Sequence, residues 1–89
     1  MTRALAVELA PHKVRVNAVL PAVIRTPMFE TLVGTENLAS VLEKSERHYP
    51  LRRVGEPIDV ARAILFLAHP ENSWITGAQI TVDGGISAV

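Results

Sequence analysis

The sequence predicts an α/β chain built around a parallel β-sheet. Segments with helical and strand-like patterns follow one another in the order helix, strand, helices, strand, which is the order that a parallel α/β sheet produces. The first strand-like segment, residues 14–20, carries apolar residues on both faces, as is typical of strands that helices cover on each side. Residues 57–69 show the clearest helical pattern of the chain.

The first predicted helix covers residues 1–10. Leu5 and Leu9 lie one helical turn apart, and Pro11 ends the pattern. Because no capping residue precedes the pattern, we expect the chain to begin inside a longer helix. Residues 14–20 are then predicted to form a strand that ends at the following proline.

The middle of the chain is predicted to contain two short helices between loops. Residues 21–27 form the first loop, and a helix over 28–33 is broken by Gly34. A second helix is expected over 37–48, where an apolar stripe faces a charged side. Residues 50–55 return to a loop.

The helix over residues 57–69 has recognisable ends. Pro57 suits the first helical position, Asp59 complements the positive end of the helix dipole, and Pro70 ends the helix. Its apolar residues occupy two opposite sides, one with Val60, Ala63 and Leu67 and the other with Ile58, Ala61, Ile64, Leu65 and Ala68. A surface helix needs an apolar arc of roughly 100°, so we expect this helix to have two partners. A strand over 79–82 and a turn over 83–85 follow.

Composition narrows the possible functions. The 89 residues include nine basic and nine acidic ones, so no net charge attracts nucleic acid or an anionic membrane, and we expect neither as a partner. The absence of cysteine excludes disulfides, thiolate metal sites and thiol catalysis. There is no signal-peptide pattern, and the longest apolar run, residues 63–68, falls far short of a membrane helix. We therefore expect a cytoplasmic location.

The number of strands disagrees with the fold class. Two strands do not form a stable open sheet in water without further partners. We therefore expect these residues to be one part of a larger α/β domain.

Several stretches together resemble the short-chain dehydrogenases/reductases. Residues 2–10 are similar to the helix after the catalytic Tyr-x-x-x-Lys of that family, and residues 14–19 to its sixth strand. The remaining similarities are residues 21–28 to the loop Pro-Gly-x-x-x-Thr-x-Met, 50–57 to the start of the sixth helix, and 75–77 and 82–85 to the last turn and strand end. The resemblance implies that residues 1–89 form the C-terminal part of a Rossmann-like, doubly wound parallel sheet, with the last two strands and their flanking helices.

The resemblance implies an oxidoreductase that moves a hydride between NAD or NADP and an alcohol or its carbonyl form. In the family the matching loop binds the nicotinamide, so the implied cofactor-binding residues are Pro21, Ala22, Ile24 and Thr26. The Thr26 side chain and the Ile24 backbone would bind the carboxamide, which needs both a donor and an acceptor. The other interpretation is that Thr26 caps the next helix. Ala22 stands where glycine is usual, and glycine allows a closer approach of the backbone to a cofactor.

The catalytic Ser, Tyr and Lys of the family cannot be assigned in this sequence. The only tyrosine, Tyr49, is followed four residues later by Arg53 instead of lysine. The resemblance thus implies a truncated piece, and we expect the 89-residue chain alone to be inactive. The alternative function is a non-catalytic interaction module that docks through its exposed helix and sheet edge.

The resemblance also implies a substrate lid and an interface. Residues 28–49 would form the lid over a small alcohol or carbonyl substrate, and Phe29, Leu32 and Val33 either line an apolar pocket or serve as ordinary packing. The helix over 57–69 and the strand over 79–83 would join copies of the chain into a homo-oligomer. These residues determine neither the substrate nor the choice between NAD and NADP.

The other polar residues receive structural interpretations. Asn17 is predicted to satisfy backbone groups near the strand edge. His12, His48 and His69 lie far apart without a partner at metal-ligand spacing, so we expect surface or helix-end positions. Asp83 and the two glycines after it are predicted to form a turn and not a cation site. No Gly-x-Ser-x-Gly motif supports a serine hydrolase.

Overall fold

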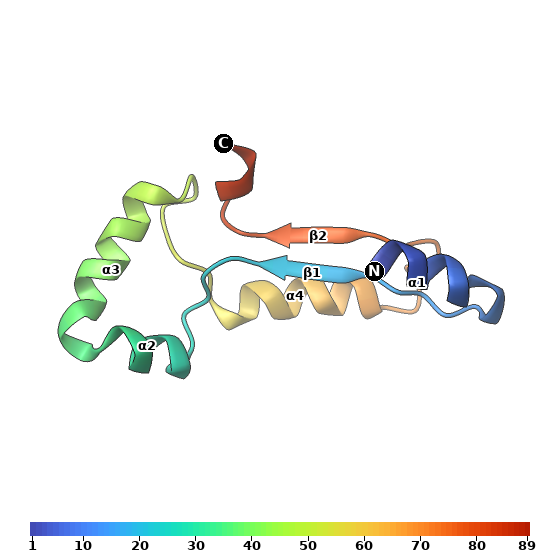
Figure 1. The fold of residues 1–89 in the computed structure, drawn as a ribbon, viewed down its shortest axis with the longest axis horizontal. Coiled ribbons are helices and arrows are strands. Elements are labelled where there is room, and N and C mark those ends of the chain that lie inside the picture. Colours follow the sequence, from blue (N-terminus) through green and yellow to red (C-terminus); the bar gives the residue numbers. More distant parts are fainter.

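The computed structural model describes all residues from Met1 to Val89. Its elements are α1 (Thr2–Leu9), β1 (Ala18–Pro21), α2 (Pro27–Val33), α3 (Thr35–His48), α4 (Pro57–Ala68) and β2 (Gln79–Val82), with 3₁₀ turns at Ala10–His12 and Ile86–Ala88. β1 and β2 are parallel neighbours, with Ala18 opposite Gln79 and Pro21 opposite Val82 (Figure 1). The predicted α/β class with a parallel sheet is confirmed.

α4 packs along one face of both strands (Figure 1). On the less exposed side of this helix, Val60 and Ala63 are half-buried and Leu67 is buried. On the other side, Ile58 and Leu65 are 51% and 67% exposed. The helix therefore has an apolar side that nothing in this chain covers, as its pattern predicts. The cover expected on the second face of the sheet is not seen, because no other helix runs along the strands (Figure 1).

The prediction of a strand over residues 14–20 is wrong in its first half, because β1 begins at Ala18. Before that residue, side chains form most of the hydrogen bonds, beside one backbone bond from the Gly77 N–H to the Val16 carbonyl at 2.7 Å. The Val16 N–H donates to Thr76 Oγ1 at 3.0 Å, and Asn17 Nδ2 donates to the Ile75 carbonyl at 3.0 Å. The Ala78 N–H donates to Asn17 Oδ1, also at 3.0 Å. The prediction that Asn17 satisfies backbone groups is thus confirmed.

The predicted helices are all present, with ends shifted by one or two residues. α1 gives way at Ala10 to a 3₁₀ turn, which closes at Lys13 in the left-handed region with φ of 58°. α2 starts one residue earlier than predicted, since proline suits its first position. α3 begins directly after Gly34, two residues early, and α4 ends at Ala68.

The chain is elongated. Its radius of gyration is 16.2 Å and its extents are 52 × 27 × 23 Å, whereas a compact domain of this length has a radius of gyration of about 12 Å. Only five residues are buried, namely Ala6, Ser45, Tyr49, Val54 and Leu67. α2 and α3 contact each other and form an arm, residues 27–48, that stands away from the sheet (Figure 1). None of the helices combines the length and apolarity needed to cross a membrane.

Candidate active-site groove

A groove of about 460 Å³ lies where both strands end. Its lining comes from the segment after β1, the segment between α3 and α4, the start of α4 and the end of β2, namely Ala22, Val23, Tyr49, Leu51, Arg53, Gly55, Asp59 and Thr81–Gly85. In open α/β sheets, ligands bind at the carboxyl ends of the strands. The groove is therefore the place in this chain where the fold favours a ligand.

The segment after β1 is held by a short parallel bridge between Ile24 and Gly55. The Arg25 N–H donates to the Gly55 carbonyl at 2.8 Å, and the Gly55 N–H donates to the Val23 carbonyl at 2.9 Å. A side chain at Gly55 would lie 2.5 Å from Ile24 Cδ1, so glycine leaves room for this close approach.

Ile24 keeps a free backbone donor and a free backbone acceptor. In a parallel bridge of this kind, the groups of the central residue point away from the partner strand. Neither the N–H nor the carbonyl of Ile24 forms a hydrogen bond within the chain. An amide-bearing ligand, with one donor and one acceptor, is the kind of molecule that satisfies both groups.

Thr26 caps α2. The Phe29 N–H donates to Thr26 Oγ1 at 3.1 Å, and the extended backbone of Thr26 is typical of an N-cap. The capping interpretation is thus confirmed. Capping still leaves the hydroxyl free to bind a ligand, because a hydroxyl group that accepts one hydrogen bond still has its own hydrogen to donate. Arg25 pairs with Glu30 at 2.9 Å, which ties the segment to the first turn of α2.

Pro21 and Ala22 continue the line of β1 into the groove. Pro21 is the last residue of the strand, and the Ala22 N–H donates to the Val82 carbonyl at 3.2 Å. Ala22 does not adopt a positive φ, so alanine replaces the usual glycine without backbone strain. Of the four predicted residues, Ala22 lines the groove, while Pro21, Ile24 and Thr26 lie next to it along the chain.

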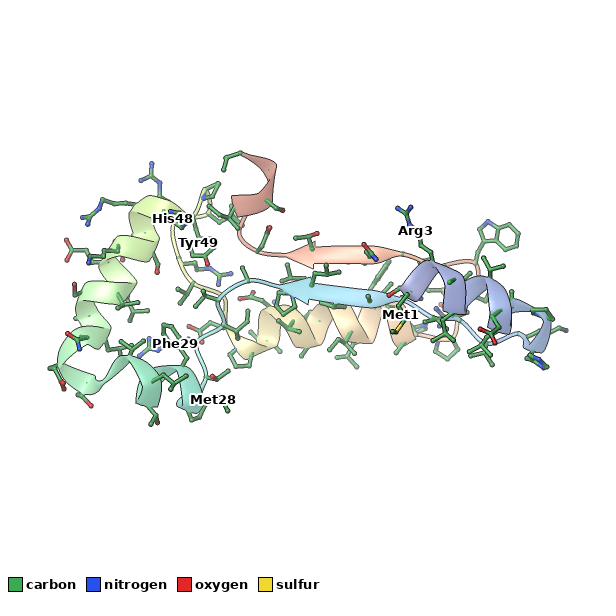
Figure 2. All side chains as sticks on the ribbon, viewed as in Figure 1. Met1, Arg3, Met28, Phe29, His48 and Tyr49 are labelled. Carbon is green, nitrogen blue, oxygen red and sulfur yellow. The ribbon has the colours of Figure 1, made fainter.

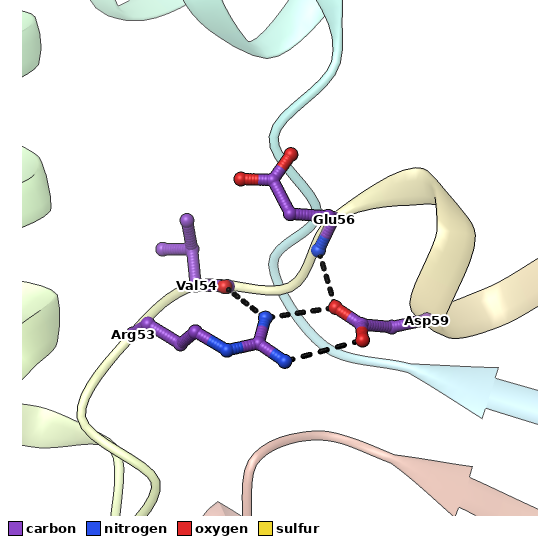
Figure 3. Close-up of polar contacts among 4 residues, drawn as sticks. All are labelled: Arg53, Val54, Glu56 and Asp59. Carbon is purple, nitrogen blue, oxygen red and sulfur yellow. Dashed lines mark hydrogen bonds and ion pairs between the residues drawn. The ribbon is translucent and has the colours of Figure 1, made fainter.

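An ion pair between Arg53 and Asp59 forms part of the lining of the groove, and Figure 3 shows its contacts. Arg53 Nη1 and Nη2 donate to the two carboxylate oxygens of Asp59 at 2.8 and 3.1 Å. Asp59 Oδ2 also accepts from the Glu56 N–H at 2.7 Å. The hydrogen bond from Arg53, with that from the Glu56 backbone, lowers the pKa of Asp59 to about 2. Sequence patterns predict the helix-end role of this carboxylate, but not its arginine partner.

Tyr49 is the aromatic residue of the groove, and the sequence predicted it only as the last residue of the lid. It is buried against Gly84, where an added Cβ would lie 3.3 Å from Tyr49 Cδ1. The Leu51 N–H donates to the Gly84 carbonyl at 3.0 Å. Figure 2 shows Tyr49 at the inner end of α3, facing the turn after β2. The turn predicted over 83–85 is confirmed, and it packs against the end of the arm.

The apolar residues predicted for the lid lie outside the groove. Phe29 and Val33 are half-buried, and Leu32 is 80% exposed. Phe29 points into the angle between α2 and α3 (Figure 2). His12, His48 and His69 are exposed, as expected, and His69 Nδ1 accepts from the Glu71 N–H at the end of α4.

Comparison with known proteins identifies the family of this chain. Residues 1–87 match the sequence model described as enoyl-(acyl carrier protein) reductase. The oxidoreductase UcpA of Escherichia coli is 41% identical over 88 residues, which cover 96% of this chain and 34% of UcpA, so the chain spans about a third of the length of this relative. A short-chain dehydrogenase family protein from Francisella tularensis has a TM-score of 0.90 and 29% identity, over 100% of this chain and 39% of that one. A structure of ElxO with NADP bound has a TM-score of 0.85 and 31% identity, over 99% and 35%. The chain therefore belongs to the enoyl-(acyl carrier protein) reductase family, within the short-chain dehydrogenases/reductases.

Proposed function

We propose that this chain forms the nicotinamide end of an NAD(P)-dependent oxidoreductase that acts on an alcohol or its carbonyl form. The observation that carries the proposal is the unpaired backbone of Ile24 beside the Thr26 hydroxyl, at the carboxyl end of a parallel strand. The NADP-bound relative ElxO supports this choice of cofactor. NAD or NADP, when bound, would supply or accept the hydride.

The residues present fit a nicotinamide carboxamide. This group has one carbonyl acceptor and one NH₂ donor, so it matches the free N–H and the free carbonyl of Ile24. The Thr26 hydroxyl adds a third polar group two residues away, and its hydrogen remains available. Ala22, which lines the groove, and Pro21 directly before it would lie next to the ring.

We further propose that residues 28–49 serve as the substrate lid. They include most of the arm, and Tyr49 at its inner end lines the groove. An element that reaches into a groove at one end and otherwise contacts little can close over a small molecule. A small alcohol or carbonyl compound would then lie between the lid and the nicotinamide.

The 89 residues by themselves are proposed to transfer no hydride. The only tyrosine is buried against Gly84, and Arg53, four residues later, is occupied by Asp59. The proton that accompanies hydride transfer needs a positioned acid or base, and this pair cannot provide one. Purified chain should therefore show no turnover of secondary alcohols with NAD or NADP. Turnover that persists after host dehydrogenases are removed would contradict the inference.

Self-association is proposed through the helix over 57–69 and the strand over 79–83. The exposed side of α4 includes Ile58, Ile64, Leu65 and Phe66, each at least half exposed. A contiguous apolar side of this kind is typical of an interaction surface. No feature of the structure favours the alternative of a non-catalytic module over the oxidoreductase.

A segment exchange tests the proposed function. In this hybrid protein, the part of UcpA that matches this chain is replaced by the 89 residues themselves. We expect the hybrid to bind NADH or NADPH, as measured by nicotinamide fluorescence, and Thr26→Val to weaken that binding. A hybrid that folds with the circular dichroism and melting temperature of UcpA, but binds neither cofactor when UcpA binds one, would refute the proposal.

A further inference from the structure

The arm is attached to the rest of the molecule through two neighbouring connections. The first is the segment from Ala22 to Thr26, and the second is the segment from Tyr49 to Glu56. The Ile24–Gly55 bridge joins the two connections side by side. The helices of the arm pack on each other, with no comparable packing against the sheet or α4. The orientation of the arm therefore depends on how these two connections are held.

One carboxylate holds the second connection to α4. Asp59, in the first turn of α4, accepts both terminal nitrogens of Arg53 and also the Glu56 N–H (Figure 3). Arg53 Nη1 further donates to the Val54 carbonyl at 3.1 Å, which fixes the guanidinium against its own backbone. A planar fork on a carboxylate restrains direction as well as distance.

The residue before this fork is held in an unfavourable conformation. Arg52 has φ of 66°, one of only two residues other than glycine with positive φ in the chain. Its N–H donates to the Tyr49 carbonyl at 2.8 Å, which forms a tight turn directly after α3. A long side chain in this region of backbone space costs free energy and persists only where surrounding contacts impose it. The fork on Asp59 is one of those contacts, and it lies one residue away.

We propose that Arg53 and Asp59 are positioning residues that set the angle of the arm over the groove. The pair fixes the turn at Arg52, and the turn fixes where α3 enters the groove at Tyr49. Opening the fork lets the arm swing about the two connections while α2 and α3 stay intact. The use of the arm as a lid rests on the proposed function, whereas the action of the pair on its angle does not.

Spin labels on the full chain measure this angle directly. The sequence has no cysteine, so spin labels attach only to cysteines that are introduced. Ser40→Cys in the arm and Ser73→Cys beyond α4 provide two exposed attachment sites. Labelled chain is diluted with unlabelled chain so that only distances within one molecule contribute. We expect one narrow distance distribution, and a broad or shifted one in Asp59→Asn and Arg53→Gln. Asparagine still accepts from the Glu56 N–H, so the helix cap is kept while the ionic fork is lost.

Two variants separate positioning from general effects. Glu43→Gln removes the ion pair between Glu43 and Arg47 inside α3, so it matches the charge change of Asp59→Asn and should leave the distribution narrow. Arg53→Lys keeps the positive charge but cannot form the two-pronged contact with the carboxylate, so we expect a distance distribution of intermediate width. Hydrogen exchange at the Arg25 and Gly55 amides should rise by about three-fold in Asp59→Asn.

The results distinguish this inference from the proposed function, because no cofactor is present. Distributions in Asp59→Asn and Arg53→Gln as narrow as in the unmodified chain, with helix content unchanged, would overturn the positioning role. Broadening in Glu43→Gln to the same degree would overturn it as well, since the effect would then belong to charge alone. If Asp59→Asn or Arg53→Gln loses helix content, the test passes to Arg53→Lys, provided that its helices are intact. A distance distribution in Arg53→Lys that is broader than in the unmodified chain supports the positioning role, and one that is equally narrow overturns it.

Discussion

Thr26 caps α2 and, in the function proposed above, also binds the cofactor, and substitution can separate these two roles. Its hydroxyl oxygen caps α2 by accepting from the Phe29 N–H at 3.1 Å, and its hydroxyl hydrogen is available to a nicotinamide carboxamide. Thr26→Val keeps the shape and removes both roles. Thr26→Asp keeps an acceptor for the cap and removes the donor, and Thr26→Ser keeps both.

The size of each effect follows from the bonds involved. Loss of the cap in Thr26→Val costs about 1 kcal/mol of helix stability, and α2 has only seven residues to absorb it. Loss of one neutral hydrogen bond to the cofactor costs about 0.5–1.5 kcal/mol, or roughly 2- to 12-fold in the dissociation constant. Thr26→Asp should therefore leave α2 as stable as before and still weaken cofactor binding.

The assay uses the hybrid protein described above. The dissociation constants of NADH and NADPH are measured by fluorescence, and the stability of α2 by hydrogen exchange at the Phe29 and Glu30 amides. The expected order of affinity is Thr26 equal to Ser, both above Asp and Val. The expected order of α2 protection is Thr26, Ser and Asp together, with Val lower. An Asp variant that binds both cofactors as tightly as threonine does would show that Thr26 is a cap and nothing more.

Three further predictions concern the rest of the chain. Asn17→Leu should destabilise the fold by about 1–3 kcal/mol, because it leaves the Ala78 N–H unpaired and removes one of the two side chains, Asn17 and Arg15, that donate to the Ile75 carbonyl; urea unfolding measures the change, and an unchanged midpoint would contradict it. The pKa of Asp59 is lowered to about 2. The ionised carboxylate therefore stabilises the fold fully at any pH above the ordinary aspartate pKa, and this stabilisation is lost as the pH falls toward 2. In Arg53→Gln, carboxyl NMR titration should give a higher midpoint for Asp59, and an unshifted midpoint would show that the arginine is not the cause. Leu65→Lys on the exposed side of α4 should reduce self-association in sedimentation at micromolar concentration, whereas Leu32→Lys on the arm should not; equal effects of the two changes would argue against an interface on α4.

Local patterns in the sequence were sufficient to predict the ends of helices and the turns that neighbouring residues specify. Pro57 and Asp59 place the start of α4, Gly34 separates α2 from α3, and Asp83 marks the final turn. These predictions succeed because the groups that decide them lie within a few residues of one another. The proposed cofactor-binding residues Pro21, Ala22, Ile24 and Thr26, at the end of β1 and directly after it, follow only from resemblance to a family.

Contacts between distant parts of the chain were decided by the tertiary structure. The start of β1 depends on Asn17 and Thr76, about sixty positions apart, whose side chains form most of the hydrogen bonds before the strand. The free donor and acceptor of Ile24 exist because Gly55 pairs with its neighbours on the other side. Tyr49 is buried because the turn at Gly84 comes against it. The sequence by itself thus determined the helices, the turns and the order of the elements, since propensity and capping act locally, but not where β1 begins. Only the tertiary structure decided which backbone groups remain unpaired and which side chains enclose the groove, because each of these outcomes depends on a partner that sequence spacing does not reveal.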